Sequence, residues 1–207
     1  MTGADWPAKA APTAATWDDL VALAVRCTAC AELAATRTTV VVGVYPPGAD
    51  VLLIGEAPGA QEDAAGVPFV GKAGQLLDAL LAEAGLERGR VAIANVLKCR
   101  PPGNRKPRRS EMERCRPWLA RQIELVDPLV ICTLGGTATE WALGRGTRIT
   151  AVRGTEQTYA GRPLIPTYHP SAAIRFGPQG APLAALREDL AQVADLARRL
   201  RAERAVR

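Results

Sequence analysis

Continuous apolar runs alternate along the chain with stretches of helical periodicity. The runs lie at residues 51–54, 91–97, 129–134 and 163–167, and each is typical of a strand buried on both faces. Apolar positions recur at helical spacing in residues 17–27, 73–84, 110–126, 137–141 and 183–200. This alternation predicts an α/β fold, a three-layer sandwich in which helices flank a central parallel sheet of four strands. The loops after the carboxyl ends of those strands are where we expect function.

The length of 207 residues predicts one domain. Residues 1–15 are rich in Ala, Pro and Thr without periodicity, which favours a flexible leader. Thr16 is a suitable N-cap for the first helix. We therefore expect a single domain over residues 16–200 and a basic, fraying tail over residues 201–207.

Composition points to a phosphate-bearing partner. Lys and Arg total 26 against 21 Asp and Glu, giving a net charge of +5, and 22 of the cations are Arg. The 48% apolar content argues against disorder, and the 4% aromatic content against a stacking-rich surface. No apolar run approaches the roughly 18 residues of a membrane helix, and residues 1–16 lack a secretion signal, so we expect a cytoplasmic protein.

The cysteines are the least ambiguous chemical signal. Cys27 and Cys30 form a CxxC pair, and Cys99 and Cys115 flank an Arg-rich loop. Four soft ligands suit either a structural zinc or a [4Fe-4S] cluster, and spacing alone does not separate the two. A thioredoxin-like pair fits less well, because Cys27 ends a helix instead of following a strand. Cys132 lies within an apolar run and is interpreted as a small buried hydrophobe.

Polar residues follow the predicted strands. Glu56 comes after the first strand in a Gly- and Pro-rich loop, which is not a Walker loop because Ala follows Lys72. Asn95 lies within the second run, where a buried amide is either a structural strut or a reader of a ligand edge. His169, the only histidine, follows the fourth strand, a better position for catalysis than most lone histidines have.

Four segments, GEAPGAQED, PFVGKAGQLLD, NVLKCRPPGNRKP and TYHPSAAIR, together with the four cysteines, closely resemble the family 4 uracil-DNA glycosylases. The resemblance covers residues 27–196. It implies the sandwich with a four-stranded parallel sheet, a structural [4Fe-4S] cluster on Cys27, Cys30, Cys99 and Cys115, and hydrolytic removal of uracil from DNA to start base excision repair.

The resemblance also assigns roles. His169 would donate a hydrogen bond to the uracil carbonyl that gains charge, and Glu56 would act on the water and sugar side, where Ala57 replaces the aspartate of other families. The substrate-binding residues would be Phe69, Asn95, Gly55, Ala57, Pro58, Gly59 and Glu62, with Glu62 narrowing the pocket against the methyl group of thymine. The DNA-binding residues would be Arg105, Lys106, Arg108, Ser171, Ile174 and Arg175, with Ile174 or Arg175 as the wedge.

Three alternatives remain at this stage. Some superfamily relatives trap the abasic product through a histidine in the basic loop, but residues 103–107 contain none. A non-catalytic sensor of uracil or damage would not need His169 and Glu56 together. A zinc scaffold or electron carrier would use the cysteines alone. We expect a monomer that acts on uracil-containing DNA, single- or double-stranded, in association with the nucleoid.

Overall fold

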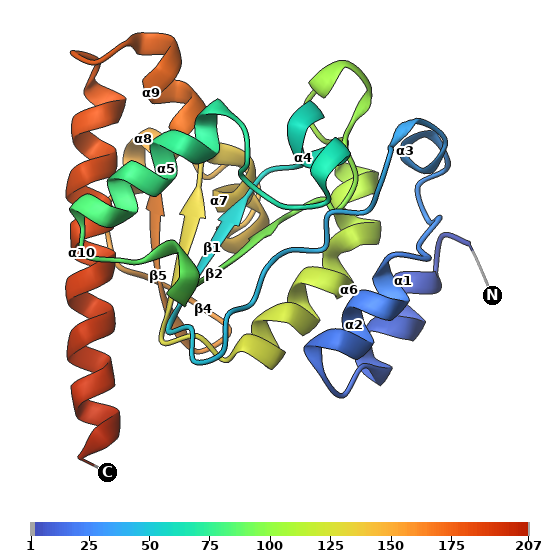
Figure 1. The fold of residues 1–207 in the computed structure, drawn as a ribbon, viewed down its shortest axis with the longest axis horizontal. Helices are drawn as coiled ribbons and strands as arrows, with labels where there is room; N and C mark the ends of the chain where they lie inside the picture. Colours follow the sequence, from blue (N-terminus) through green and yellow to red (C-terminus); the bar gives the residue numbers. More distant parts are fainter. Residues whose placement is uncertain (1–2, 207) are drawn as a thin grey trace.

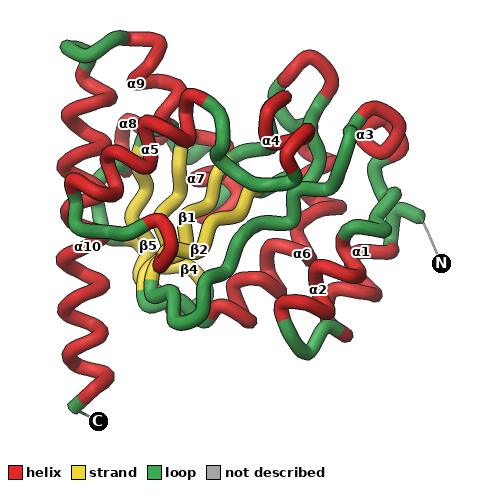
Figure 2. Tube along the Cα trace, in the orientation of Figure 1, coloured by secondary structure: helices red, strands yellow, loops and turns green. Residues whose placement is uncertain are grey.

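The computed structural model describes residues 3–206, and its centre is a five-stranded sheet in the order β2-β1-β3-β5-β4 (Figures 1 and 2). The strands are β1 (Val51–Gly55), β2 (Val91–Asn95), β3 (Val130–Leu134), β4 (Gln157–Tyr159) and β5 (Arg162–Thr167). β2, β1, β3 and β5 are parallel, which confirms the predicted parallel core. β4 adds an antiparallel edge strand, joined to β5 by Ala160 and Gly161, both at positive φ, as a tight hairpin requires.

Helices cover both faces of the sheet. One face packs against α5 (Lys72–Glu83), α9 (Pro170–Phe176) and α10 (Ala181–Ala205), which lie together at the left of Figure 1. The other packs against α6 (Arg109–Val126) and α7 (Gly136–Leu143). Leucines such as Leu77 of α5 and Leu119 of α6 are fully buried, so the core is aliphatic, as the composition predicts.

Within the segment predicted to be a flexible leader, the structure describes residues 3–15, and residues 6–13 of these are helical. α1 (Trp6–Ala10) and the 3₁₀ turn Ala11–Thr13 lie against α6, and two guanidinium nitrogens of Arg121 donate to the carbonyl of Ala14. α2 (Trp17–Ala24) and α3 (Ala31–Thr36) complete this N-terminal layer. Small alanines make these contacts, and because alanine carries little hydrophobic contrast, the sequence pattern did not reveal them.

The remaining elements are short connections. They are α4 (Ala60–Ala65), α8 (Ile149–Val152), and the 3₁₀ turns Arg88–Arg90 and Pro102–Asn104. α10 continues to Ala205, so residues 201–205, predicted to fray, are helical. Within residues 3–206 no helix is both long and apolar enough to cross a membrane.

Candidate active site and cysteine cavity

The parallel register brings the predicted site residues to one edge of the sheet. Gly55, the last residue of β1, pairs with Asn95, the last residue of β2, and Leu134 of β3 pairs with Thr167 of β5. Glu56 follows β1 directly, and His169 lies two residues beyond the end of β5. Residues more than a hundred positions apart in the chain therefore meet where the carboxyl ends of the strands converge.

Asn95 and Phe69 converge on Gly55. A Cβ atom on Gly55 would lie 2.3 Å from Oδ1 of Asn95 and 2.7 Å from Cζ of Phe69, so only glycine fits here. Asn95 is 2% exposed and Phe69 6%. Oδ1 of Asn95 has no hydrogen-bond partner among the described residues, an unusual state for a buried amide that indicates a ligand contact.

Phe69 has an unusual backbone. Its φ is 55°, a left-handed conformation that an aromatic residue rarely adopts, and such strain is concentrated at functional sites. Gly74 of α5 packs against it, since a Cβ atom on Gly74 would lie 1.7 Å from the Phe69 carbonyl oxygen. The ring centroids of Phe69 and His169 are 5.6 Å apart, which places the aromatic ring beside the imidazole.

His169 is the N-cap of α9. The backbone N–H of Ser171 donates to its Nδ1 at 3.1 Å, so Nδ1 is an acceptor and the ring proton lies on Nε2. Burial lowers the pKa of His169 to about 4, although the negative charge of Glu62 opposes this shift. At neutral pH the imidazole is therefore uncharged, with Nε2–H available as a hydrogen-bond donor.

Glu56 opens into a cleft of about 590 Å³. Thr137, near the start of α7, donates its hydroxyl proton to Oε2 of Glu56 at 2.5 Å. The cleft is lined by residues from the ends of the strands, the basic loop and α9, among them Glu56, Ala57, Lys106, Thr137, His169 and Arg175. A carboxylate and a neutral imidazole thus share one cavity, an arrangement suited to stabilising opposite charges on two sides of a bond.

The carboxylate of Glu62 accepts hydrogen bonds from backbone N–H groups of two neighbouring segments. Its Oε1 accepts hydrogen bonds from the N–H groups of Val70, at 3.0 Å, and Gly71, at 2.8 Å, and its Oε2 accepts from Gly59. These bonds fasten the start of α4 to the loop that carries Phe69. Its predicted role against thymine remains a prediction, and the structure adds a structural role that the sequence did not indicate.

The basic loop is partly neutralised from within. Arg105 forms a two-point ion pair with Glu111 and a further one with Glu32, and Arg108 also pairs with Glu32. Burial raises the pKa of Glu111, but hydrogen bonds from Arg105 and the Arg108 backbone outweigh it and leave the pKa below its usual range. Arg105 therefore organises the loop, and Lys106, which is exposed and lines the cleft, is the freer cation.

α9 presents its exposed side chains beside the cleft. Ser171 and Arg175 line the cleft, while Ile174 is 47% exposed. Phe176 at the end of the helix is 66% exposed, and sequence reasoning did not single it out. Exposed apolar side chains next to a cleft are candidates for contact with a partner.

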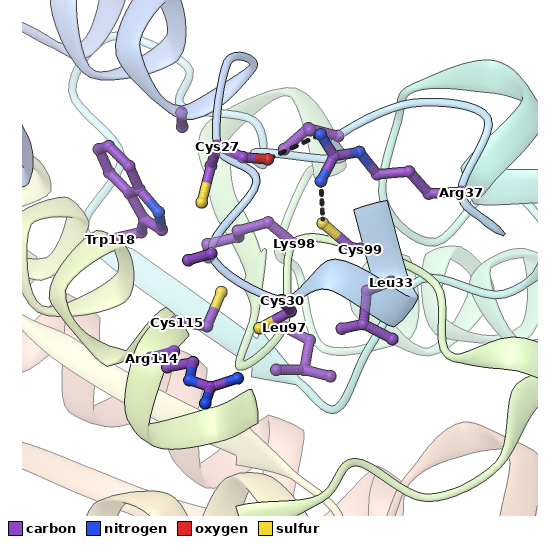
Figure 3. A pocket seen from close by; sticks show the side chains of 13 residues that line it. Cys27, Cys30, Leu33, Arg37, Leu97, Lys98, Cys99, Arg114, Cys115 and Trp118 are labelled. Atoms are coloured by element: carbon purple, nitrogen blue, oxygen red, sulfur yellow. Dashed lines mark hydrogen bonds between the residues drawn. The ribbon is translucent and has the colours of Figure 1, made fainter. Parts of the chain in front are cut away.

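Four of the five free cysteines surround a second cavity. Cys27, Cys30, Cys99 and Cys115 line it together with Arg37, Lys98 and Arg114 (Figure 3). Cys132 lies elsewhere, buried in β3, as expected. No three Cys, His, Asp or Glu side chains in residues 3–206 lie close enough together to hold a single metal ion.

The cavity favours neutral thiols in the free protein, yet it is rich in cations. Burial raises the pKa of Cys99 to about 11 and that of Cys115 to about 12. Nη1 of Arg37 donates to Sγ of Cys99 at 3.1 Å while Nη2 donates to the carbonyl of Cys27 at 2.7 Å. Burial lowers the pKa of Lys98 to about 8, opposed by its proximity to Cys115 and Cys99.

Taken together, these features define an α/β protein with a polar site at the carboxyl edge of its sheet and a separate cysteine-lined centre. The family model of the uracil DNA glycosylase superfamily matches residues 42–191. The chain is 46% identical over 152 residues to a type-4 uracil-DNA glycosylase of Thermotoga maritima, covering 72% of this chain and 79% of the relative.

Two further relatives give the same result. The chain is 42% identical over 170 residues to the type-4 uracil-DNA glycosylases of Sulfurisphaera tokodaii and Archaeoglobus fulgidus, covering 78% of this chain and 76% and 84% of those proteins. The chain therefore belongs to the uracil-DNA glycosylase superfamily, within its type-4 group.

Three contributors to these sites were missed at the level of sequence. Thr137 follows two glycines at the end of β3, a position at the functional edge that could have marked it. No sequence signal identifies Lys98 and Arg37, because the neighbouring residues do not show whether a Lys or Arg side chain is buried or exposed to solvent.

Proposed function

We propose that this protein hydrolyses the N-glycosidic bond between uracil and deoxyribose in DNA, as the initiating step of base excision repair. The observation that carries the proposal is the meeting of Glu56, Asn95 and His169 at one edge of the sheet in a chain of the type-4 group. Breaking this bond leaves electrons on the base and positive charge on the sugar, so the site must stabilise both.

Asn95 and Phe69 supply base recognition. The unpartnered Oδ1 of Asn95 accepts a hydrogen bond from N3–H, a donor that uracil has and neutral cytosine lacks, while the amide nitrogen donates to O4. Phe69 offers its ring face for stacking. Gly55 leaves room at the point where both side chains approach.

His169 stabilises the leaving group. With Nδ1 held by the Ser171 N–H, the neutral ring donates Nε2–H to the uracil carbonyl that gains negative charge as the bond breaks. The bonding electrons leave with N1 of uracil, and the uracil anion takes its proton from solvent. A neutral donor serves this purpose without giving up its own proton.

Glu56 acts on the sugar side. Its carboxylate, held by Thr137, orients water toward C1′ and stabilises the cationic sugar. The water oxygen bonds to C1′ and its released proton passes through the carboxylate to solvent. Hydrolysis then leaves an abasic site and free uracil.

The cysteine cavity would hold a [4Fe-4S] cluster on Cys27, Cys30, Cys99 and Cys115. Four cysteines that line one cavity supply the ligands that a [4Fe-4S] cluster requires, and the similarity of the chain to type-4 uracil-DNA glycosylases favours a cluster over a single zinc. When bound, the cluster would supply a structural link between residues 27–30 and the basic loop. Arg37 would donate to one of its thiolates.

DNA would follow the cleft. Lys106 and Arg108 would contact phosphate, with Arg105 shaping their loop. Ser171, Ile174 and Arg175 on α9 would fill the space that a flipped uracil leaves.

Single-turnover cleavage of a labelled oligonucleotide with one uracil tests this proposal. Scission that appears only after alkali, with free uracil released, is the expected result. A protein–DNA band that survives denaturation would instead show covalent trapping, and binding without either product would show a sensor. H169A should reduce the rate far more than DNA affinity, because its role is confined to the transition state.

The cysteine set has an internal control. C99S should yield protein without the iron and visible absorbance of the wild type, whereas C132A should retain both, since Cys132 lies in β3 away from the cavity. Iron and sulfide analysis of the two variants, beside zinc analysis, distinguishes a cluster from a zinc site.

A further inference from the structure

Lys98 lies between the cysteine cavity and the uracil-reading end of β2. Its side chain lines the cavity among the cysteines (Figure 3), and the residue is 1% exposed. Nζ donates a hydrogen bond to the backbone carbonyl of Asn95 at 2.7 Å. One side chain thus touches both centres of the molecule.

A fully buried lysine requires a compensating charge. Lysine is almost never buried completely unless it is paired, because desolvating an ammonium group is costly. Within the part of the chain that the structure describes, the hydrogen bond of the Lys98 ammonium is to the neutral Asn95 carbonyl. The groups able to balance its charge are the cavity cysteines, which become thiolates when they bind metal.

The hydrogen bond from Lys98 to Asn95 lies at the backbone segment that positions the Asn95 amide and Glu56. Beyond the last pair of β1 and β2, the N–H groups of Val96 and Leu97 donate to the carbonyls of Gly55 and Glu56, at 2.9 and 3.0 Å. The segment from Asn95 to Leu97 therefore sets the placement of the base-reading amide and of the backbone at Glu56. The Lys98 ammonium reaches back over this segment to its first carbonyl.

We propose that Lys98 is a positioning residue that couples occupancy of the cysteine cavity to uracil recognition. A negatively charged cluster with its thiolates fixes the ammonium group, and the ammonium fixes the carbonyl end of β2, from which the Asn95 amide projects toward the base. The inference rests on the proposed function, because it assumes a cluster in the cavity and uracil at Asn95.

Arg37 provides the matched comparison. It reaches the same cavity and donates hydrogen bonds to Cys99 and to the carbonyl of Cys27, but none of its hydrogen bonds within residues 3–206 reaches β2. R37Q therefore removes a cation from the cavity only, whereas K98M removes a cation and also the hydrogen bond to Asn95. Comparing the two variants separates these effects.

The first measurement is affinity for free uracil and for uracil-containing DNA, on fractions matched for iron content. K98M should bind uracil about tenfold more weakly than wild type, the scale of losing one charged hydrogen-bond donor, while R37Q, which removes a cavity cation without the contact to Asn95, should weaken uracil binding clearly less than K98M does. K98R, which retains the charge, should recover part of the loss. Equal uracil affinity of K98M and wild type at full iron content would overturn the proposal.

The second measurement needs no variant. Hydrogen exchange of the wild-type holoprotein is compared with the same protein after the cluster is removed by oxidation and chelation. The amides of Val96 and Leu97 should exchange faster in the stripped protein, whereas those of β3 should not change. Unchanged protection at Val96, with loss confined to residues that line the cysteine cavity, Leu97 among them, would overturn the coupling.

These readouts separate the two levels of proposal. Failure of the wild type to release uracil would contradict the glycosylase assignment, and absence of iron would contradict the cluster. Protein that contains iron and releases uracil, but shows no change in exchange or in uracil affinity, would contradict the role of Lys98 alone.

Discussion

The hydroxyl of Thr137 donates a hydrogen bond to the carboxylate of Glu56, from a residue 81 positions further along the chain. Thr137 comes after β3 and Glu56 after β1, which are neighbouring parallel strands. The bond therefore exists because the sheet aligns their carboxyl ends, and it fixes the orientation of the group proposed to act on the sugar side.

Replacing Thr137 tests that orientation. T137V keeps the shape but removes the donor, so we expect single-turnover cleavage to slow by about tenfold or more, as for loss of a hydrogen bond to a charged group. T137S retains a hydroxyl and should stay near the wild-type rate. Equal impairment in both variants would mean that packing of the Thr137 methyl group, and not the hydrogen bond, matters.

The imidazole of His169 should remain uncharged well below neutral pH. Burial lowers its pKa to about 4, so the unfolded chain, with a histidine pKa of about 6.5, binds the proton first as the pH falls. Its contribution to stability is thus complete above pH 6.5 and is lost as the pH falls toward 4. Because His169 is the only histidine, nitrogen NMR of the ring reports its protonation directly, and we expect the Nε2–H tautomer at pH 7. A titration midpoint of the His169 ring near pH 6.5 would contradict the lowered pKa.

Arg105 and Lys106 should respond differently to substitution. K106A removes a free cation and should reduce the slope of log affinity against log salt by about 0.7 to 0.9. R105Q breaks the buried pair with Glu111 and should lower the thermal midpoint and iron retention while changing the slope less. DNA titrations at several salt concentrations, beside thermal melts, compare the two. Arg105 would be a phosphate contact after all if its variant showed the larger change in slope.

Gly74 should tolerate no side chain. A methyl group would overlap the carbonyl of Phe69, so G74A must displace the strained loop, and we expect a stability loss of about 3 kcal/mol or more with weaker uracil binding. G89A is the control, because no atom lies within 4 Å of a Cβ at Gly89. Thermal melts and uracil titration measure both effects. A wild-type melting midpoint for G74A would show that this loop is not held as described.

The exposed end of α9 should matter most for duplex substrates. I174A removes a proposed wedge, so cleavage of uracil in duplex DNA should fall by about tenfold while cleavage in single strands changes little, because only the duplex must be unstacked. F176A measures whether the second exposed side chain shares this role. Equal losses on both substrates would point to a general contact with DNA.

The sequence was informative wherever a signal is local. The buried runs predicted the parallel strands, and long motifs around Glu56, Asn95 and His169 predicted the family, which the comparisons confirm. It did not predict the helices at residues 6–13 and 201–205, because alanine-rich packing and a continuing helix carry weak hydrophobic contrast.

What the sequence determined by itself is the set of chemical groups: four thiols, one imidazole, one amide at a strand end and an arginine-rich loop. Only the tertiary structure decided which of them are free to act. It pairs Arg105 with Glu111, engages Glu62 with backbone, adds Thr137 to Glu56 and buries Lys98 between two centres. Such pairings depend on which distant segments are brought within a few ångströms, and the packing of the whole sheet, not the order of residues, sets those distances.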